Sequence, residues 1–250
     1  MKFVLNEQYE SQREWLEHLP QTFEHTGEIV YDARNQIRRI NGLMVKRFHI
    51  PSLFNRIIYT YFRTPKAARA YQNGLYLLSH GISTPAPIAY LLDGTHLLRE
   101  SYLITKESRL PHLMREFTLD YRPELDELIR PFARFTARMH NAKILHLDYS
   151  PGNILWDKIS STSPSVGTEK EDEYQFEVID INRMCVGKEV SLQAGCKSMR
   201  RICARTSFFR IFADEYARVR GFDPIETEQT ILYYRDRFWA NGEKARYQYD

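Results

Sequence analysis

With 250 residues, 43% hydrophobic and 13% aromatic, the chain has the composition of an ordinary globular protein that can bury a substantial core. The N-terminal stretch MKFVLNEQYESQREW lacks the apolar core of a signal peptide, and no stretch reaches the roughly 20 apolar residues of a membrane span. Three cysteines without a CxxC pair favour reduced thiols over a disulfide framework or a zinc site. We therefore expect a soluble, cytoplasmic protein of one two-lobed domain or two small domains.

The net charge is only +3, but the charges are unevenly distributed. No Asp or Glu occurs from Ala33 to Leu92, and nine Lys or Arg residues lie within 33–69. A second basic segment, 197–220, carries seven Lys or Arg residues interleaved with three phenylalanines. This second pattern fits either a solvated helix face over a packed aromatic stripe, or a contact with a phosphorylated or membrane-surface substrate.

The first predicted elements are three antiparallel strands within residues 28–50. The β-like runs break at residues 33–35 and again at Asn41-Gly42, and an Asn-Gly pair is the strongest short hairpin signal. Lys46 then lies on the third strand. Thr64-Pro65 opens a predicted helix, with the proline in its first turn, that continues to about His80, where Gly81 ends it.

Later elements follow from hydrophobic periodicity. Strands are expected near 88–92 and 97–105, a long amphipathic helix over 123–141, and an apolar strand over 176–181 with Asp180 near its end. Residues 158–174 combine Ser, Thr, Pro and Gly with clustered charge, which predicts a mobile hairpin insertion. From 192 to 249 the pattern is helical, with a break at 221–224.

The chemistry is concentrated in the stretch ILHLDYSPGNILWD, residues 144–157. Phosphoryl transfer from a nucleoside triphosphate needs a fixed cation over the phosphates, which Lys46 can supply. The metal ions that bridge the phosphates need hard oxygen ligands, which Asn153 and Asp180 offer. The attacking hydroxyl needs a carboxylate that orients it and receives its proton, a role open to Asp148.

The same residues also permit a purely structural interpretation. His146 could be a hydrogen-bonded core histidine, Asp148 a turn or capping residue, and Pro151-Gly152-Asn153 an ordinary turn. The order of the elements favours chemistry, because a strand lysine precedes the His-x-Asp-x-x-x-x-Asn motif and an apolar strand with an aspartate follows it.

The chain resembles the protein-kinase-like fold and, within it, the lipopolysaccharide kinase family, bacterial enzymes that phosphorylate inner-core sugars such as heptose or Kdo. The stretches that carry the resemblance are GEIVYDARNQIRRI with VKRF, GISTPAPIAY, SYLIT, HLDYSPGNIL and VIDINR. The resemblance implies phosphate contact by Lys46, a catalytic base at Asp148, and magnesium ligation by Asn153 and Asp180. It also implies that the backbone near Ile104 and Lys106 contacts adenine.

The sequence departs from protein kinases at several positions. The turn that should cover the phosphates contains no glycine, so it must rely on Arg34, Asn35 and backbone amides. The helix over 66–80 contains no acid to pair with Lys46, and its Gln72 or Asn73 could only hydrogen-bond. Ile181-Asn182 replaces Phe-Gly and no Ala-Pro-Glu segment follows, which argues against a peptide acceptor.

We therefore expect an α+β, protein-kinase-like two-lobed fold. Residues 1–105 would form a small antiparallel-sheet N-lobe, and residues 106–250 a mainly helical C-lobe. The expected reaction transfers the γ-phosphoryl of ATP, with Mg²⁺, to a sugar hydroxyl of the lipopolysaccharide inner core. The partner would be this glycolipid or sugar, with peripheral contact at the cytoplasmic face of the inner membrane and no nucleic acid.

Two alternatives keep the fold but change the function. One is a small-molecule kinase of the aminoglycoside or choline type, whose cationic acceptors would fit the basic segments poorly. The other is a catalytically silent, kinase-shaped binding protein. The missing glycines and the missing helix glutamate favour that alternative, whereas Lys46, Asp148, Asn153 and Asp180 all argue against it.

Overall fold

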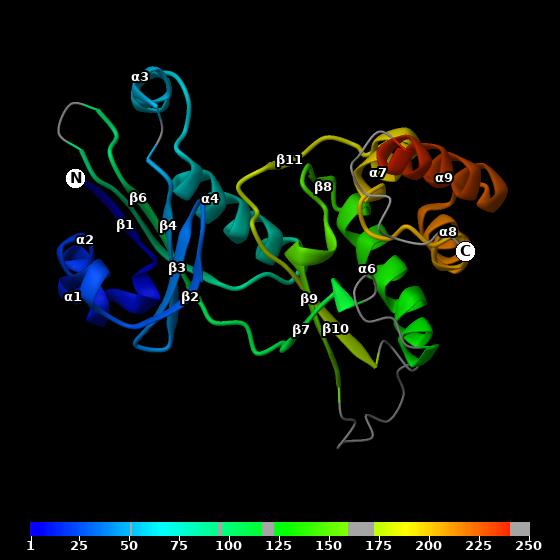
Figure 1. Cartoon of the computed structure of the whole chain (residues 1–250), viewed down its shortest axis with the longest axis horizontal. Helices are drawn as coiled ribbons and strands as arrows, with labels where there is room; N and C mark the ends of the chain where they lie inside the picture. Colours follow the sequence, from blue (N-terminus) through cyan, green and yellow to red (C-terminus); the bar gives the residue numbers. More distant parts are fainter. Residues whose placement is uncertain (51, 95–96, 117–122, 160–172, 241–250) are drawn as a thin grey trace. The chain divides into compact units, whose positions relative to one another are not determined.

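The computed structural model describes residues 1–50, 52–94, 97–116, 123–159 and 173–240 (Figure 1). The chain divides into two compact units. The first unit consists of Met1–Arg109 and the short segment Asp180–Asn182, and the second consists of Leu110–Ile179 and Arg183–Asp250. Among the described residues, no helix combines the length and the apolar character that crossing a bilayer requires.

An antiparallel six-stranded sheet forms the centre of the first unit, with the strand order β1-β5-β6-β4-β3-β2. The strands are β1 (Lys2–Leu5), β2 (Glu28–Asp32), β3 (Gln36–Ile40), β4 (Leu43–Phe48), β5 (Pro87–Leu92) and β6 (Ser101–Lys106). Both predicted hairpins are confirmed. Asn41 and Gly42 have φ values of 50° and 73°, as a two-residue hairpin turn requires.

Helices cover both faces of this sheet. One face packs against η1 (Glu7–Gln12), α1 (Arg13–Glu17), α2 (Leu19–Thr22) and η2 (Phe23–His25), in a core that joins Leu16 and Phe23 to Val45. The other face packs against α4 (Lys66–Ser79), where the rings of Tyr71 and Tyr90 lie 5.3 Å apart. A further helix, α3 (Leu53–Tyr61), precedes α4.

Helices dominate the second unit. They are η3 (Pro123–Leu128), α6 (Ile129–Asn141), η4 (Pro151–Asn153), α7 (Leu192–Met199), α8 (Thr206–Arg220) and α9 (Pro224–Ala240). Two small antiparallel sheets accompany them, one from β7 (His112–Leu113), β9 (Ile154–Lys158) and β10 (Tyr174–Val178), the other from β8 (Ile144–His146) and β11 (Met184–Val186). The ring of Phe132 on α6 packs against Tyr149, Phe176 and Phe212 at the centre of this unit.

The aromatic stripe predicted in the second basic segment is part of this core. Phe208, Phe209 and Phe212 on α8 are fully buried, whereas Arg210 and Arg218 on the same helix are exposed. The expectation of a packed aromatic stripe beneath a solvated basic helix face is therefore confirmed for α8.

Several predicted boundaries are wrong for identifiable reasons. The helix predicted from residue 123 becomes α-helical only at Ile129, because Pro131 has no N–H for the carbonyl four residues earlier and fits only in a first turn. The strand predicted from 97 begins at Ser101, because Asp93 and Glu100 close a hairpin turn through their backbones. The strand predicted to 181 ends at Val178, because Asp180 has a left-handed backbone.

Other differences concern elements that the sequence did not predict. The strand β1 and the helix α3 were not expected, and the C-terminal helical region is interrupted between Met199 and Thr206. Pro65 lies at the N-cap of α4 and not in its first turn. The core of the predicted mobile insertion, 160–172, and the end of the predicted helical region, 241–249, lie outside the described residues.

Candidate active site

Lys46 and Asp180 form an ion pair within the first unit. The Lys46 Nζ donates to Asp180 Oδ1 at 2.6 Å, and Asn182 Nδ2 donates to the same oxygen at 2.7 Å. Lys46 also lies 5.1 Å from the centre of the Phe48 ring. Its side chain is only 16% exposed, so solvent screens the pair less than it would screen a surface ion pair.

The backbone around Asp180 is held in an unusual conformation. Asp180 has a φ of 55°, in the left-handed region that few non-glycine residues occupy and that Asp and Asn tolerate best. Asn73 Nδ2 on α4 donates to the Ile181 carbonyl at 2.6 Å. Asn73, on the helix that lacks an acid to pair with Lys46, therefore hydrogen-bonds the segment that carries Asp180.

Arg34 and Asn35 lie on the turn between β2 and β3, as predicted. Asn35 Oδ1 accepts a hydrogen bond from the His49 backbone N–H at 3.1 Å, and the Asn35 carbonyl accepts from the Ala33 N–H at 3.2 Å. Asn35 therefore stabilises this turn, whereas the Arg34 side chain is exposed. Contact of either residue with a nucleotide stays a prediction.

Ile104 and Lys106 lie on β6, beside β4 and β5. Ile104 is fully buried, with Val45 and Ala89 as its neighbours across the sheet. The Lys106 backbone N–H donates to the Ala86 carbonyl at 2.9 Å. That N–H is occupied within the sheet, and the backbone contact of this stretch with adenine stays a prediction.

His146 fixes the backbone of the loop that carries Asp148. The imidazole is fully buried at the end of β8, where Nδ1 accepts from the Asp148 N–H and Nε2 donates to the Ile179 carbonyl, both at 3.1 Å. The structural interpretation of His146 as a hydrogen-bonded core histidine is thus confirmed. The same two contacts hold Asp148 in place.

Asn153 is tied to the same loop through its side chain and its backbone. Its Nδ2 donates to the Asp148 carbonyl at 2.9 Å, and its own carbonyl accepts from the Ile179 N–H at 2.9 Å. Because the amide nitrogen is engaged in this way, the amide oxygen is the side-chain atom left to act as a ligand. An amide oxygen suits a hard cation such as Mg²⁺.

The Asp148 carboxylate forms an ion pair with Arg201, which lies between α7 and α8. Residues 149–153 of the loop contain no Lys or Arg, so this nearby positive charge comes from a distant part of the chain. The sequence allowed the basic segment 197–220, which includes Arg201 and Arg205, to contact a phosphorylated or membrane-surface substrate, but it gave no signal for the contact with Asp148. Arg205 instead pairs with Asp126 at 3.5 Å.

Arg200 and Arg201 both form cation–π contacts with Phe238. Their Cζ atoms lie 5.6 and 5.7 Å from the centre of the Phe238 ring on α9, and Arg200 Nη1 donates to the Lys197 carbonyl at 2.6 Å. Partial burial and then the charge of Arg201 lower the pKa of Arg200, and Asp148 opposes this shift. Two guanidinium groups beside one carboxylate leave a net positive charge that can attract an anion.

The predicted magnesium ligands are Asp180 in the first unit and Asn153 in the second, and their binding of one ion stays a prediction. Within the described ranges, no cluster of three or more His, Cys, Asp or Glu side chains could hold a metal ion, and the three cysteines are free thiols. Asp180 and Asn153 would offer one carboxylate and one amide oxygen. This set is adequate because Mg²⁺ usually takes one or two protein ligands and completes its shell with water and phosphate oxygens.

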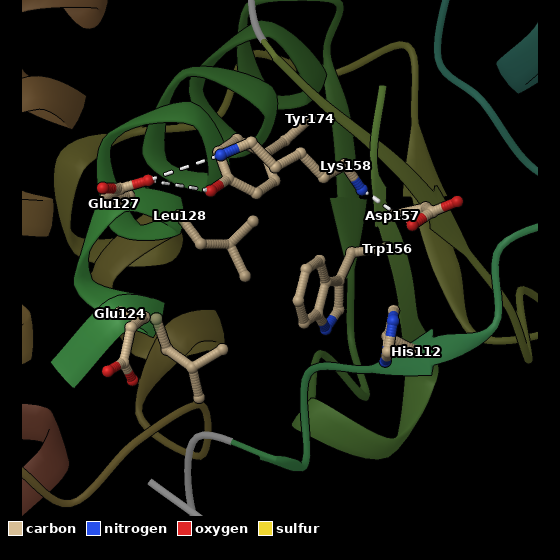
Figure 2. Close-up of a pocket in the computed structure, with 9 residues that line it drawn as sticks. His112, Glu124, Glu127, Leu128, Trp156, Asp157, Lys158 and Tyr174 are labelled. Atoms are coloured by element: carbon tan, nitrogen blue, oxygen red, sulfur yellow. Dashed lines mark hydrogen bonds and ion pairs between the residues drawn. The ribbon is translucent and has the colours of Figure 1, made fainter. Parts of the chain in front are cut away.

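A cavity of about 350 Å³ lies in the second unit (Figure 2). His112 stacks on Trp156 on one side, and the ion pair between Lys158 and Glu127 lies beside Tyr174 on the other. None of the predicted site residues contributes to its lining. The cavity therefore does not coincide with the predicted phosphoryl-transfer residues.

Comparison with known proteins identifies the family of this chain. Residues 33–191, well over half of the chain, match the model of the lipopolysaccharide kinase (Kdo/WaaP) family. The structure of WaaP in complex with acyl carrier protein is similar with a TM-score of 0.61 at 19% identity, covering 95% of this chain and 98% of that chain. This likeness shows a kinase fold, with a sheet-rich N-terminal region and a helical C-terminal region.

A weaker similarity is to the bifunctional kinase-methyltransferase WbdD, with a TM-score of 0.46 at 10% identity. It covers 86% of this chain and 43% of that chain. No curated protein sequence matches the chain.

Proposed function

Because the chain belongs to the lipopolysaccharide kinase (Kdo/WaaP) family, whose members are ATP-dependent phosphotransferases that act on sugar hydroxyls, we propose that it phosphorylates a Kdo or heptose hydroxyl of the inner core. The observation that carries the proposal is the loop at Asp148. There His146 and Asn153 hold the backbone of one carboxylate, as a catalytic base requires.

The proposed nucleotide contacts lie in the N-lobe, residues 1–105, and at its C-terminal border. Lys46 would bind the phosphates of ATP, and the turn at Arg34 and Asn35 would cover them. The backbone at Ile104 and Lys106 would contact adenine. Magnesium, held by Asp180 and Asn153, would offset the negative charge of the phosphates. The 2.6 Å pair of Lys46 with Asp180 supports this assignment, because each side chain is already held beside an opposite charge.

The proposed transfer occurs at the acceptor hydroxyl, in the C-lobe of residues 106–250. Asp148 would orient this hydroxyl and receive its proton as the oxygen attacks the γ-phosphorus. The new bond joins the sugar oxygen to the phosphorus, while the bond to the bridging β–γ oxygen breaks and ADP leaves. Arg201 would keep the carboxylate pointing in one direction through their ion pair.

The charge beside Asp148 supports an acidic acceptor. Inner-core sugars of this family carry carboxylates or phosphates, and Arg200 and Arg201 offer guanidinium groups that bind such anions in a planar, two-point manner. A cationic acceptor of the aminoglycoside or choline type would be repelled here. The glycolipid acceptor would be reached at the cytoplasmic face of the inner membrane.

The direct test is transfer of labelled γ-phosphate from ATP to inner-core glycolipids that contain Kdo and heptose. We expect Asp148→Asn to lower kcat by about 1,000-fold, since general-base catalysis contributes roughly 100- to 10,000-fold. Asp157→Asn is the matched control, because Asp157 lies on β9 and its Oδ1 accepts only a local hydrogen bond from the Lys158 N–H in the described contacts. Absence of transfer to every inner-core acceptor by the wild type would refute the proposed function.

A further inference from the structure

The helix α3 presents an exposed apolar face. Leu53, Phe54, Ile57 and Tyr61 have exposed fractions of 64%, 73%, 41% and 65%, and Phe62 directly after the helix is also exposed. Because a helix turns by 100° per residue, these four positions fall within a 100° arc on one side. Side chains of this size are seldom grouped on a surface without a binding partner.

A flank of α3, about 90° around the helix from the centre of this face, is hydrogen-bonded to the first unit. Arg56 Nε donates to the Leu98 carbonyl at 2.7 Å, and the Leu98 N–H donates to Thr60 Oγ1 at 2.9 Å. Arg56 and Thr60 lie one turn apart on the side away from Phe54. These contacts fix the rotation of α3 about its own axis and leave its apolar face exposed.

Two exposed arginines lie close to α3 in the chain or beside its hydrogen-bonded partner Leu98. Arg63 follows the helix, is exposed, and lies 5.8 Å from the centre of the Tyr59 ring, and the exposed Arg99 follows Leu98. The acid next to Arg99 in the sequence, Glu100, is engaged by Tyr102 and lies 3.8 Å from Arg47. An apolar, aromatic face beside arginines is typical of a helix that lies in the headgroup region of an anionic membrane.

We infer that α3 docks the first unit onto an anionic lipid surface. Leu53, Phe54, Ile57 and Tyr61 enter the boundary between headgroups and acyl chains, and Arg63 with Arg99 contacts lipid phosphates. The choice of a membrane as partner rests on the proposed function, because a lipopolysaccharide precursor is itself anchored in a bilayer. The basic surroundings favour anionic lipid over a second copy of this equally basic surface.

The test is co-sedimentation with vesicles of phosphatidylethanolamine and phosphatidylglycerol, compared with vesicles of phosphatidylcholine alone. Wild type should bind the anionic vesicles more strongly, and added salt should weaken the binding. The double variant Leu53→Gln with Phe54→Gln should bind at least about tenfold more weakly, since it removes two large apolar side chains from the contact. Arg63→Gln should weaken binding to anionic vesicles and leave binding to neutral vesicles unchanged.

The matched control is Ile225→Gln, which also replaces an exposed apolar side chain by glutamine but lies on α9, where Ile225 is 68% exposed. This variant should bind vesicles as the wild type does. Equal vesicle binding by wild type and the double variant would overturn the inference, as would no binding by wild type. So would a wild type that sediments as a dimer and a double variant that sediments as a monomer, because α3 would then contact a second copy.

Failure of this inference can be distinguished from failure of the proposed function. Phosphorylation of a deacylated, water-soluble inner-core oligosaccharide does not require a membrane. The double variant should keep wild-type turnover of that acceptor and lose turnover of the same acceptor embedded in vesicles. If the protein bound vesicles but phosphorylated neither form of the acceptor, the proposed function would be refuted and the inference about α3 would remain.

Discussion

The two carboxylates of the candidate site are held by different kinds of partner. Asp180, in the first unit, accepts hydrogen bonds from Lys46 on β4 and from Asn182, two residues further along its own segment. Asp148, in the second unit, forms an ion pair with Arg201, which lies outside the motifs identified in the sequence. This difference fits the proposed function, in which Asp180 serves the common donor ATP and Asp148 serves an acceptor particular to this chain.

Of the two charged partners, the one that pairs with Asp180 should have the larger effect when it is removed. We expect Lys46→Met to lower kcat/KM for ATP by about 100-fold, because a fixed cation over the phosphates is lost. Lys2→Met is the control, since Lys2 lies exposed on β1 of the same sheet. Steady-state kinetics with varied ATP measure the change. An unaltered kcat/KM for ATP would show that Lys46 does not contact the nucleotide.

Removing the partner of Asp148 should have a smaller effect on a different substrate. Arg201→Gln is expected to raise the acceptor KM about tenfold and to leave the KM for ATP unchanged, because the role proposed for Arg201 is to bind the acidic acceptor. Arg201→Lys should restore part of the loss, since it keeps the charge without the planar fork. Arg210→Gln on α8 removes the same charge from an exposed position and should change neither constant.

A further prediction concerns stability in the second unit and not turnover. Burial, followed by the charge of Arg220, lowers the pKa of His140 to about 3, and its Nδ1 hydrogen-bonds the Tyr216 hydroxyl at 2.8 Å. The unfolded chain therefore binds a proton below about pH 6.5 that the folded chain does not. Stability should decrease as the pH falls from about 6.5 toward 3, by up to about 1.4 kcal/mol per unit.

Denaturant unfolding at pH 7 and pH 5 measures this loss, and we expect about 2 kcal/mol between neutral pH and pH 5 from His140. His140→Gln keeps a hydrogen-bonding side chain without a titrating group, so its stability should depend less on pH. An identical pH dependence in both proteins would mean that other groups cause the acid sensitivity. This measurement shows how much of any loss of activity at low pH is caused by unfolding and not by a change in catalysis.

Local signals predicted the parts of the fold that depend on neighbouring residues. Asn41-Gly42 specified a hairpin because both positions require a positive φ, and this placed Lys46 on its strand. The long-range pairing of β1 with β5 could not be predicted, because Lys2 and Leu92 are brought together only by the completed sheet. The helix α3 was missed because its apolar residues face solvent, which a prediction based on core formation does not anticipate.

The candidate site shows the same division. Lys46, Asp148, Asn153 and Asp180 could be named from chemistry and spacing, since a motif keeps reactive groups at fixed separations in the sequence. The pairing of Arg201 with Asp148, and of Asn73 with the Ile181 carbonyl, depends on which helices pack together. No local pattern records such packing, so these contacts required the folded chain.

The most direct test of the account is a thermal-shift titration with ATP, with and without magnesium, on wild type, Asp180→Asn and Asp148→Asn. Ligands raise the melting temperature only when the native state binds them. We predict a magnesium-dependent rise in wild type and in Asp148→Asn that disappears in Asp180→Asn. No rise in wild type at any nucleotide concentration, or a rise independent of magnesium, would contradict the account and favour a catalytically silent, kinase-shaped binding protein.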